Sequence, residues 1–98
     1  MENNHTINLA IQILPKSKTI DSYLLVDKAI EVIQNSGVRY MVCPFETVME
    51  GEYQELIHIV EKARDAVFEA GADEMLINIK IQARKNSDVT ILDKMEKY

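Results

Sequence analysis

The sequence contains one cysteine, two prolines, three glycines and no tryptophan in 98 residues. A lone cysteine excludes a disulfide within one chain and a metal site built from paired cysteines, and it fits a reducing cytoplasm. Few prolines and glycines, together with 47% hydrophobic residues, are typical of a chain that folds. A chain of this length is expected to form one domain, residues 1–98.

A tract of one charge sign is also missing. The formal net charge is −5, and 11 lysines and arginines are scattered among 16 acidic residues. Nucleic acid is therefore not an expected partner, because a phosphate backbone is bound by a basic stripe or tract. No apolar run approaches the roughly 20 residues of a membrane span, and no basic region precedes an apolar run at the start. We expect a cytoplasmic protein with no membrane partner.

Four segments are predicted to be strands. Residues 6–14, TINLAIQIL, and residues 75–84, MLINIKIQAR, alternate between apolar and polar side chains, the period of two that marks half-buried strands. Pro15 is expected to end the first. Two short β-rich runs, VRYMVC and FETVMEG, flank Pro44 and predict an antiparallel hairpin that turns near residues 44–46.

Two longer segments predict amphipathic helices. Thr19 or Asp21 is expected to cap the first helix and Gly37 to end it, and the second runs from residue 52 to Gly71. Asp88 is expected to cap a short final helix. The predicted buried positions are Tyr23, Val26, Ala29, Ile30 and Ile33 in the first helix and Tyr53, Leu56, Ile57, Val60, Ala63, Val67 and Ala70 in the second, with Leu25, Ile59 and Phe68 off these stripes.

The resulting order is β-α-β-β-α-β with a terminal helix. Right-handed crossovers place both long helices on one face of a four-stranded antiparallel sheet, so the predicted fold class is α+β, ferredoxin-like. The other face of such a sheet is left to water or to a partner. Here that face carries Ala10 and Leu76 among polar side chains, which favours a homo-oligomer over a monomer.

Several enzyme classes lack their residues. The loop LPKSKTID has no glycine-rich, arginine-containing phosphate cradle of the kind an acylphosphatase of this fold needs, and the first and last strands have no aromatics to stack on RNA. His5 and His58 are expected at the surface, and Cys43 is expected to be a small buried hydrophobe. Because no nucleophile, base and orienting group cluster, we predict no enzyme, no catalytic residue, no metal and no cofactor.

The stretch YMVCPFETVMEG, residues 40–51, allows two interpretations. Glu50 and Glu52 come just before the second helix, where the positive end of the helix dipole favours carboxylates. Thr47 suits a strand, and Tyr40 suits a core. Alternatively, Glu50 faces a pocket beside Thr47 and attracts a cationic ligand.

The same stretch resembles the YkoF-like small thiamine-binding family, whose members carry a tyrosine-rich strand, a proline, a threonine and a Glu-Gly pair that opens the second helix. Tyr40, Pro44, Thr47 and the pair Glu50-Gly51 match this pattern in place. AIEVIQNSGVRY and the tail from residue 77 resemble the family as well, so the resemblance spans nearly the whole chain. The sequence departs from it at Glu46, where relatives often have a small or neutral residue, and at Gln82, where many have aspartate.

This resemblance implies a ferredoxin-like fold assembled into dimers and tetramers that bind thiamine, or its hydroxymethylpyrimidine part, without catalysis. Thiamine presents a flat aminopyrimidine ring with donors and acceptors, and a thiazolium cation. The candidate ligand-binding residues are Tyr40 for stacking, Asn8, Gln12 and Thr47 for hydrogen bonds, and Glu50 near the cation. Whether Thr47 meets Asn8 and Gln12 depends on the strand register after Pro44. The alternative function is an amino-acid-responsive regulatory module that dimerises through its sheet.

Overall fold

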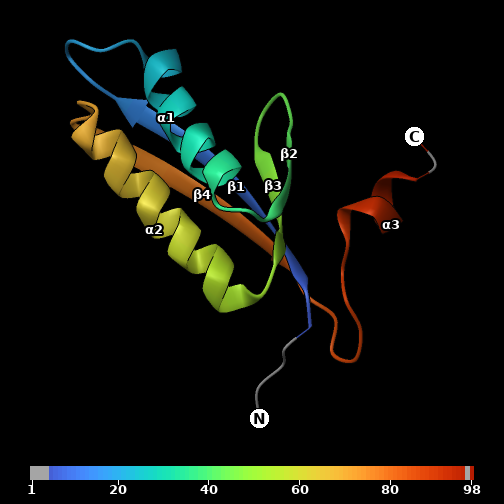
Figure 1. The fold of residues 1–98 in the computed structure, drawn as a ribbon. Coiled ribbons are helices and arrows are strands. Elements are labelled where there is room, and N and C mark those ends of the chain that lie inside the picture. Colours follow the sequence, from blue (N-terminus) through green and yellow to red (C-terminus); the bar gives the residue numbers. More distant parts are fainter. Residues whose placement is uncertain (1–4, 97) are drawn as a thin grey trace.

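A computed structural model of the chain describes residues 5–96 and 98 (Figure 1). Over these residues the elements are β1 (Ile7–Lys16), α1 (Ser22–Asn35), β2 (Arg39–Val42), β3 (Thr47–Gly51), α2 (Tyr53–Glu69), β4 (Glu74–Gln82) and α3 (Ile91–Met95). The strands form an antiparallel sheet in the order β2-β3-β1-β4, and α1 and α2 lie together on one of its faces (Figure 1). The α+β, ferredoxin-like prediction is confirmed.

The core lies between this face of the sheet and the two long helices. Its strand residues are Ile7, Leu9, Ile11, Ile13 and Met49, and its helix residues are Leu25, Ala29, Ile33, Leu56, Ile59, Val60, Ala63 and Val67. The predicted helix stripes were wrong in part, because Leu25 and Ile59 are buried whereas Tyr23 and Tyr53 are exposed. Both helices carry apolar residues on more than one face, so periodicity alone allows more than one orientation, and packing on the sheet selects among them.

Pro15 does not end β1, and that prediction was wrong. The pairing of β1 with β3 stops at Ile11 opposite Thr47, whereas the pairing with β4 continues to Lys16 opposite Glu74. Proline lacks an N–H and fits a strand where that side of the backbone has no partner. Pro15 lies in the half of β1 that pairs only with β4, so the missing donor does not break the sheet.

The helix ends follow local capping rules with one correction. Asp21 caps α1, since its carboxylate accepts a hydrogen bond from Tyr23 N at 3.0 Å. Thr90, not Asp88, caps α3, because the Thr90 hydroxyl accepts from Asp93 N at 3.0 Å. The Asp88 carboxylate instead accepts a hydrogen bond from Thr6 N at 2.7 Å, which ties the C-terminal region to the start of β1.

Residues 88–91, which we call the C-terminal strap, cover part of the other face of the sheet. Val89 N donates to Thr6 O at 2.9 Å, and Asn8 Nδ2 donates to Val89 O at 3.0 Å. Ile91 N donates to Glu50 Oε1 at 2.7 Å, and the Val89 side chain is completely buried. The expectation that this whole face is left to water or a partner was therefore wrong. Figure 1 shows α3, which follows the strap, on the side away from α1 and α2.

Candidate functional site

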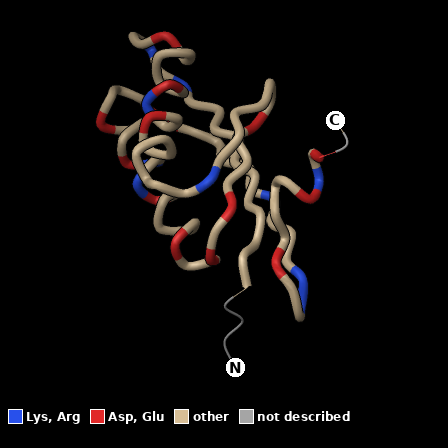
Figure 2. Tube along the Cα trace, turned by 45° about the vertical axis from the view of Figure 1, so that its right-hand side comes forward, with Lys and Arg blue, Asp and Glu red and all other residues tan. Residues whose placement is uncertain are grey.

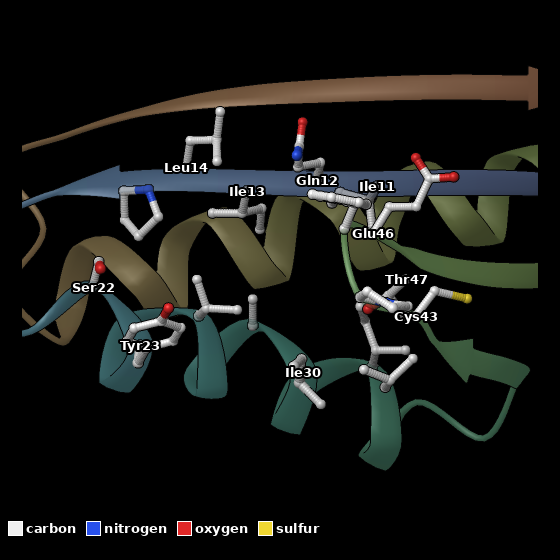
Figure 3. Close-up of a pocket in the computed structure, with 17 residues that line it drawn as sticks. Ile11, Gln12, Ile13, Leu14, Ser22, Tyr23, Ile30, Cys43, Glu46 and Thr47 are labelled. Carbon is white, nitrogen blue, oxygen red and sulfur yellow. The ribbon is translucent and has the colours of Figure 1, made fainter.

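A hollow of about 390 Å³ lies between α1, the half of β1 beyond Ile11, and the tip of the β2–β3 hairpin. We call it the α1–β1 groove. Figure 3 shows β1 and α1 as its long walls, with Thr47 and Cys43 toward one end and Tyr23 toward the other. Its lining includes Ile11, Gln12, Ile13, Leu14, Pro15, Tyr23, Val26, Ile30, Val42, Cys43, Pro44, Phe45, Glu46 and Thr47.

The short hairpin creates this groove. Cys43 N donates to Glu46 O at 2.9 Å, and the chain turns between them through Pro44 and Phe45. The register that sets Ile11 opposite Thr47 would place Phe45 opposite Ile13, but Phe45 has already left the strand. Residues 12–16 of β1 therefore have no neighbouring strand on this side within the described chain, and α1 passes beside the free edge.

The α1 wall is a second apolar stripe. Tyr23, Val26 and Ile30 recur at steps of three and four residues, so they lie on one face of the helix. Val26 and Ile30 are half-buried, and Tyr23 is 80% exposed. The sequence pattern placed these residues in the core. The structure instead gives the core to the neighbouring stripe that contains Leu25, and leaves this one to line the groove.

Two exposed aromatic rings and the Thr47 hydroxyl stand out at the groove. Phe45, at the hairpin tip, is 81% exposed, close to the value for Tyr23. Thr47 is 7% exposed, and its hydroxyl makes no hydrogen bond to any residue that the structure describes. A free hydroxyl in a largely apolar wall is the kind of group that orients a small ligand.

The groove carries little charge. Among its described lining residues, Glu46 is the only aspartate, glutamate, lysine or arginine. The Glu46 Oε1 lies 3.0 Å from Lys80 Nζ. Elsewhere, acidic and basic residues are interspersed along the chain (Figure 2). Since no lysine or arginine stands among these lining residues, the groove suits a neutral or cationic small molecule better than a phosphate.

Of the predicted ligand-binding residues, Thr47 and Gln12 both line the groove. They approach it from opposite faces of the sheet. Thr47 opposes Ile11 and faces the helices, whereas the Gln12 side chain points to the other face, where its Oε1 accepts a hydrogen bond from Asn78 Nδ2 at 3.1 Å (Figure 3). Tyr40 opposes Met49 and shares the helix-facing side with Thr47, but it is absent from the lining that the described residues form.

Asn8 and Glu50 lie elsewhere. They oppose each other on the face away from the long helices, and both hold the C-terminal strap. Asn8 is 3% exposed, and its Oδ1 has no hydrogen-bond partner among the described residues. The structure therefore does not bring Glu50 beside Thr47. A carboxylate does lie close to the groove, but it belongs to Glu46, which the sequence interpretation singled out only as a departure from the family. The exposed rings of Tyr23 and Phe45 also line the groove and were not among the predicted ligand-binding residues.

Other kinds of site find no support in the part of the chain that the structure describes. No three or more His, Cys, Asp or Glu residues there are grouped so that they could hold a metal ion. No helix within the described ranges is long and apolar enough to cross a membrane. Cys43 is half-buried and lines the groove, so it is more open than the buried hydrophobe expected from the sequence.

Comparisons with known proteins agree on a family. A family model described as thiamine-binding protein matches residues 9–98. A UPF0045 protein of Clostridium perfringens (strain 13 / Type A) is 40% identical over 93 residues, which cover 95% of this chain and 97% of the relative. Neither name is that of an enzyme.

Two solved structures have the same fold along almost their whole length. A domain of unknown function, DUF77, from Bacillus cereus matches with a TM-score of 0.93 and 43% identity, covering 99% of this chain and 95% of that one. A Thermotoga maritima protein assigned provisionally to thiamine biosynthesis or salvage matches with a TM-score of 0.85 and 26% identity, covering 95% and 98%.

Proposed function

The chain belongs to the thiamine-binding protein family, and we propose that it binds thiamine or its hydroxymethylpyrimidine moiety in the α1–β1 groove, without catalysing a reaction. The observation that carries this proposal is the unpartnered Thr47 hydroxyl at the end of an apolar groove flanked by exposed aromatic rings. The Thermotoga maritima relative, with its provisional place in thiamine metabolism, supports the same ligand class. The lone cysteine fits a role in the cytoplasm.

The chemistry of the groove matches the two parts of thiamine. A pyrimidine ring has flat faces that pack on apolar walls, and the rings of Tyr23 and Phe45 are free to stack on it. Its polar edge needs donors and acceptors, and the Thr47 hydroxyl supplies one such group. A hollow of about 390 Å³ falls in the range of small-molecule sites.

The groove changes which side chains carry the roles expected from the sequence. Thr47 keeps its hydrogen-bonding role, and Gln12 remains at the rim. Stacking passes from Tyr40 to Tyr23 or Phe45, because these rings flank the groove. The carboxylate near the cation becomes Glu46 rather than Glu50, since Glu50 is engaged with the strap. An ion pair with Lys80 weakens the pull of Glu46 on a cation.

We also propose a homo-oligomer, a dimer or tetramer, that forms along the outer edge of β4. This strand has a neighbour on one side only, because β4 ends the described sheet. Ile79 and Ile81 face the helix side and are still 40% and 44% exposed, since α2 does not cover them. A long edge strand with exposed apolar residues is a template for pairing with another strand, and a second copy offers the same edge.

Sedimentation equilibrium of Ile79→Lys tests this assembly. A charge on the β4 edge is expected to lower the mass toward that of the monomer, whereas Leu24→Lys on exposed α1 is expected to leave the mass unchanged. An unchanged mass of the Ile79 variant, or a monomeric wild-type protein, contradicts the β4 interface.

The amino-acid-responsive regulatory module remains the competing function. An amino acid carries a carboxylate, which arginine or lysine normally pairs with. No such side chain stands among the described residues that line the groove, so this ligand class finds less support here. The two functions predict different ligands, because the regulatory module binds an amino acid and does not bind thiamine.

Calorimetric titration of the extensively dialysed protein with thiamine and with hydroxymethylpyrimidine tests the proposed function. Thr47→Val is expected to weaken binding about tenfold, because one hydrogen bond is lost at nearly constant volume. Thr47→Ser keeps a hydroxyl and should bind nearly as the wild type does, and Thr19→Val serves as an exposed control. No heat from either ligand at millimolar concentration, with heat from an amino acid, would move the regulatory module to first place.

A further inference from the structure

The free half of β1 presents backbone groups as well as side chains. In an antiparallel sheet, successive residues of a strand direct their N–H and C=O groups alternately to the two neighbouring strands. The hydrogen bond from Cys43 N to Glu46 O shows that Glu46 directs its groups to β2, so Thr47 directs its own to β1. Ile11 opposes Thr47 and therefore faces β3, and Ile13, two residues on, faces the same side.

Two further observations give the same alternation. Lys16 O accepts a hydrogen bond from Asp73 N at 2.7 Å, which places the groups of Lys16 on the β4 side. Pro15 then directs its ring nitrogen to the free edge, the position where a strand tolerates proline. Ile13 is thus the first residue past the β3 ladder whose N–H and C=O both point to the edge that the hairpin leaves empty, and it lines the groove.

We infer that the backbone N–H and C=O of Ile13 bind the amine-bearing edge of an unphosphorylated 4-aminopyrimidine, in the place that Phe45 would take if the hairpin were longer. This inference rests on the proposed function and names the contact that selects the ligand. The ring nitrogen next to the amine accepts from Ile13 N–H, and the amine donates to Ile13 C=O. The pyrimidine thereby continues the β1–β3 ladder by one residue.

The Ile13 backbone and a 4-aminopyrimidine match in their hydrogen-bonding pattern, and the groove around them suits the ring. An extended residue offers an adjacent donor and acceptor on one side, and a 4-aminopyrimidine offers an adjacent acceptor and donor. An N–H and C=O at a strand edge that no other strand covers can both pair with a ligand that carries the complementary edge. Val26 and Ile30 on α1 supply apolar surface for the ring, and no lysine or arginine stands among the described lining residues to hold a phosphate.

Proline substitution at residue 13 distinguishes the contribution of the backbone N–H to binding from that of the Ile13 side chain. Ile13→Pro removes the N–H donor, and the strand is expected to keep its fold because the donor lies on the edge that has no strand beside it, as at Pro15. Ile13→Ala is the matched control, since it loses the side chain but keeps the N–H. Both variants are to be checked for cooperative unfolding.

The experiment is calorimetric titration of the wild type and both variants with hydroxymethylpyrimidine and with its analogue that lacks the 4-amino group. Loss of the amine is expected to weaken binding to the wild type tenfold or more. Ile13→Pro is expected to bind hydroxymethylpyrimidine at least tenfold more weakly than Ile13→Ala does. In the wild type, saturating hydroxymethylpyrimidine is expected to slow hydrogen exchange of the Ile13 amide at least tenfold, a readout that does not depend on how the variants fold.

The outcomes separate the inference from the function on which it rests. Wild-type protein that binds neither thiamine nor hydroxymethylpyrimidine overturns both. Wild-type binding with equal affinities of Ile13→Pro and Ile13→Ala, or with unchanged exchange of the Ile13 amide, overturns the backbone contact and leaves thiamine binding standing. If Ile13→Pro does not unfold cooperatively, the exchange measurement alone decides.

Discussion

The two halves of β1 share one alternation of apolar and polar side chains but have different neighbours. From Ile7 to Ile11 the strand pairs with β3 and β4, and Asn8 anchors the C-terminal strap. From residue 12 to Lys16 it pairs with β4 alone, and its other edge borders the α1–β1 groove. The same local sequence pattern therefore makes a closed structural half and an open half with unused hydrogen-bonding groups. We expect substitutions of buried side chains to change stability in both halves, because Ile13 of the open half also belongs to the core, and substitutions around the groove to change binding.

The largest effect is expected at the core of the closed half. Leu9 is completely buried, so Leu9→Ala should lower the free energy of unfolding by about 2–5 kcal/mol through lost burial and a cavity. Leu14, in the open half, is 44% exposed, and Leu14→Ala should lower it by less than about 1 kcal/mol. Urea denaturation of both variants measures the difference. Equal losses would mean that the Leu14 side chain, on the face away from the helices, is packed as tightly as that of Leu9.

The strap gives the next largest effect. Glu50→Ala removes the acceptor of Ile91 N and should reduce the free energy of unfolding by about 1–3 kcal/mol, with faster hydrogen exchange in residues 88–96. Glu50→Gln keeps an acceptor and should exchange nearly as the wild type does. Thiamine affinity should stay within about twofold in both, since Glu50 faces away from the groove. A large loss of thiamine affinity in Glu50→Gln would place this carboxylate at the ligand after all.

A smaller effect is expected at the hairpin tip. Phe45→Ala should leave stability nearly unchanged, because the ring is mostly exposed, and should weaken thiamine binding about two- to tenfold if the ring stacks on the ligand. Phe68→Ala on α2 is the matched control, an exposed phenylalanine outside the groove. Titration calorimetry of both variants decides, and equal affinities would exclude Phe45 from the site.

The smallest effect is expected from charge at the rim. Glu46→Gln removes a carboxylate that is already paired with Lys80, so thiamine should bind only about twofold more weakly. The difference in affinity between variant and wild type should shrink at high salt, because salt screens the charge. Hydroxymethylpyrimidine has no thiazolium cation, and its affinity should not change. A tenfold loss for both ligands would show that Glu46 contacts the pyrimidine instead of the cation.

Much of the fold followed from local patterns. The alternation in β1 and β4, the turn at Pro44 and the glycines after both long helices predicted the order of elements. The N-cap of α3 was less predictable, because two nearby side chains can accept the hydrogen bond. The Asp88 carboxylate accepts from Thr6 N instead, and the Thr90 hydroxyl caps the helix. The length of β1 was misjudged because a proline ends a strand only when its missing N–H faces a partner strand.

The site was predictable only in part. Thr47 and Gln12 lie at the groove, and the register brings both to its hairpin end. Tyr40 lies outside the groove on the helix-facing side of the sheet. Asn8 and Glu50 lie on the other face, where they bind the C-terminal strap, and the spacing of residues in the strands does not predict which face the strap covers. The surplus of apolar residues on α1 was a usable signal, since Tyr23, Val26 and Ile30 form a stripe beyond what the core uses.

Periodicity and turn residues by themselves determined the elements, their order and the buried face of each long strand, because these depend on contacts between residues close in the chain. The tertiary structure decided where β1 loses its neighbour, how α1 is rotated and which face the strap covers. These depend on the hairpin being shorter than the strand beside it and on packing between segments far apart in sequence. The groove exists because of that difference in length.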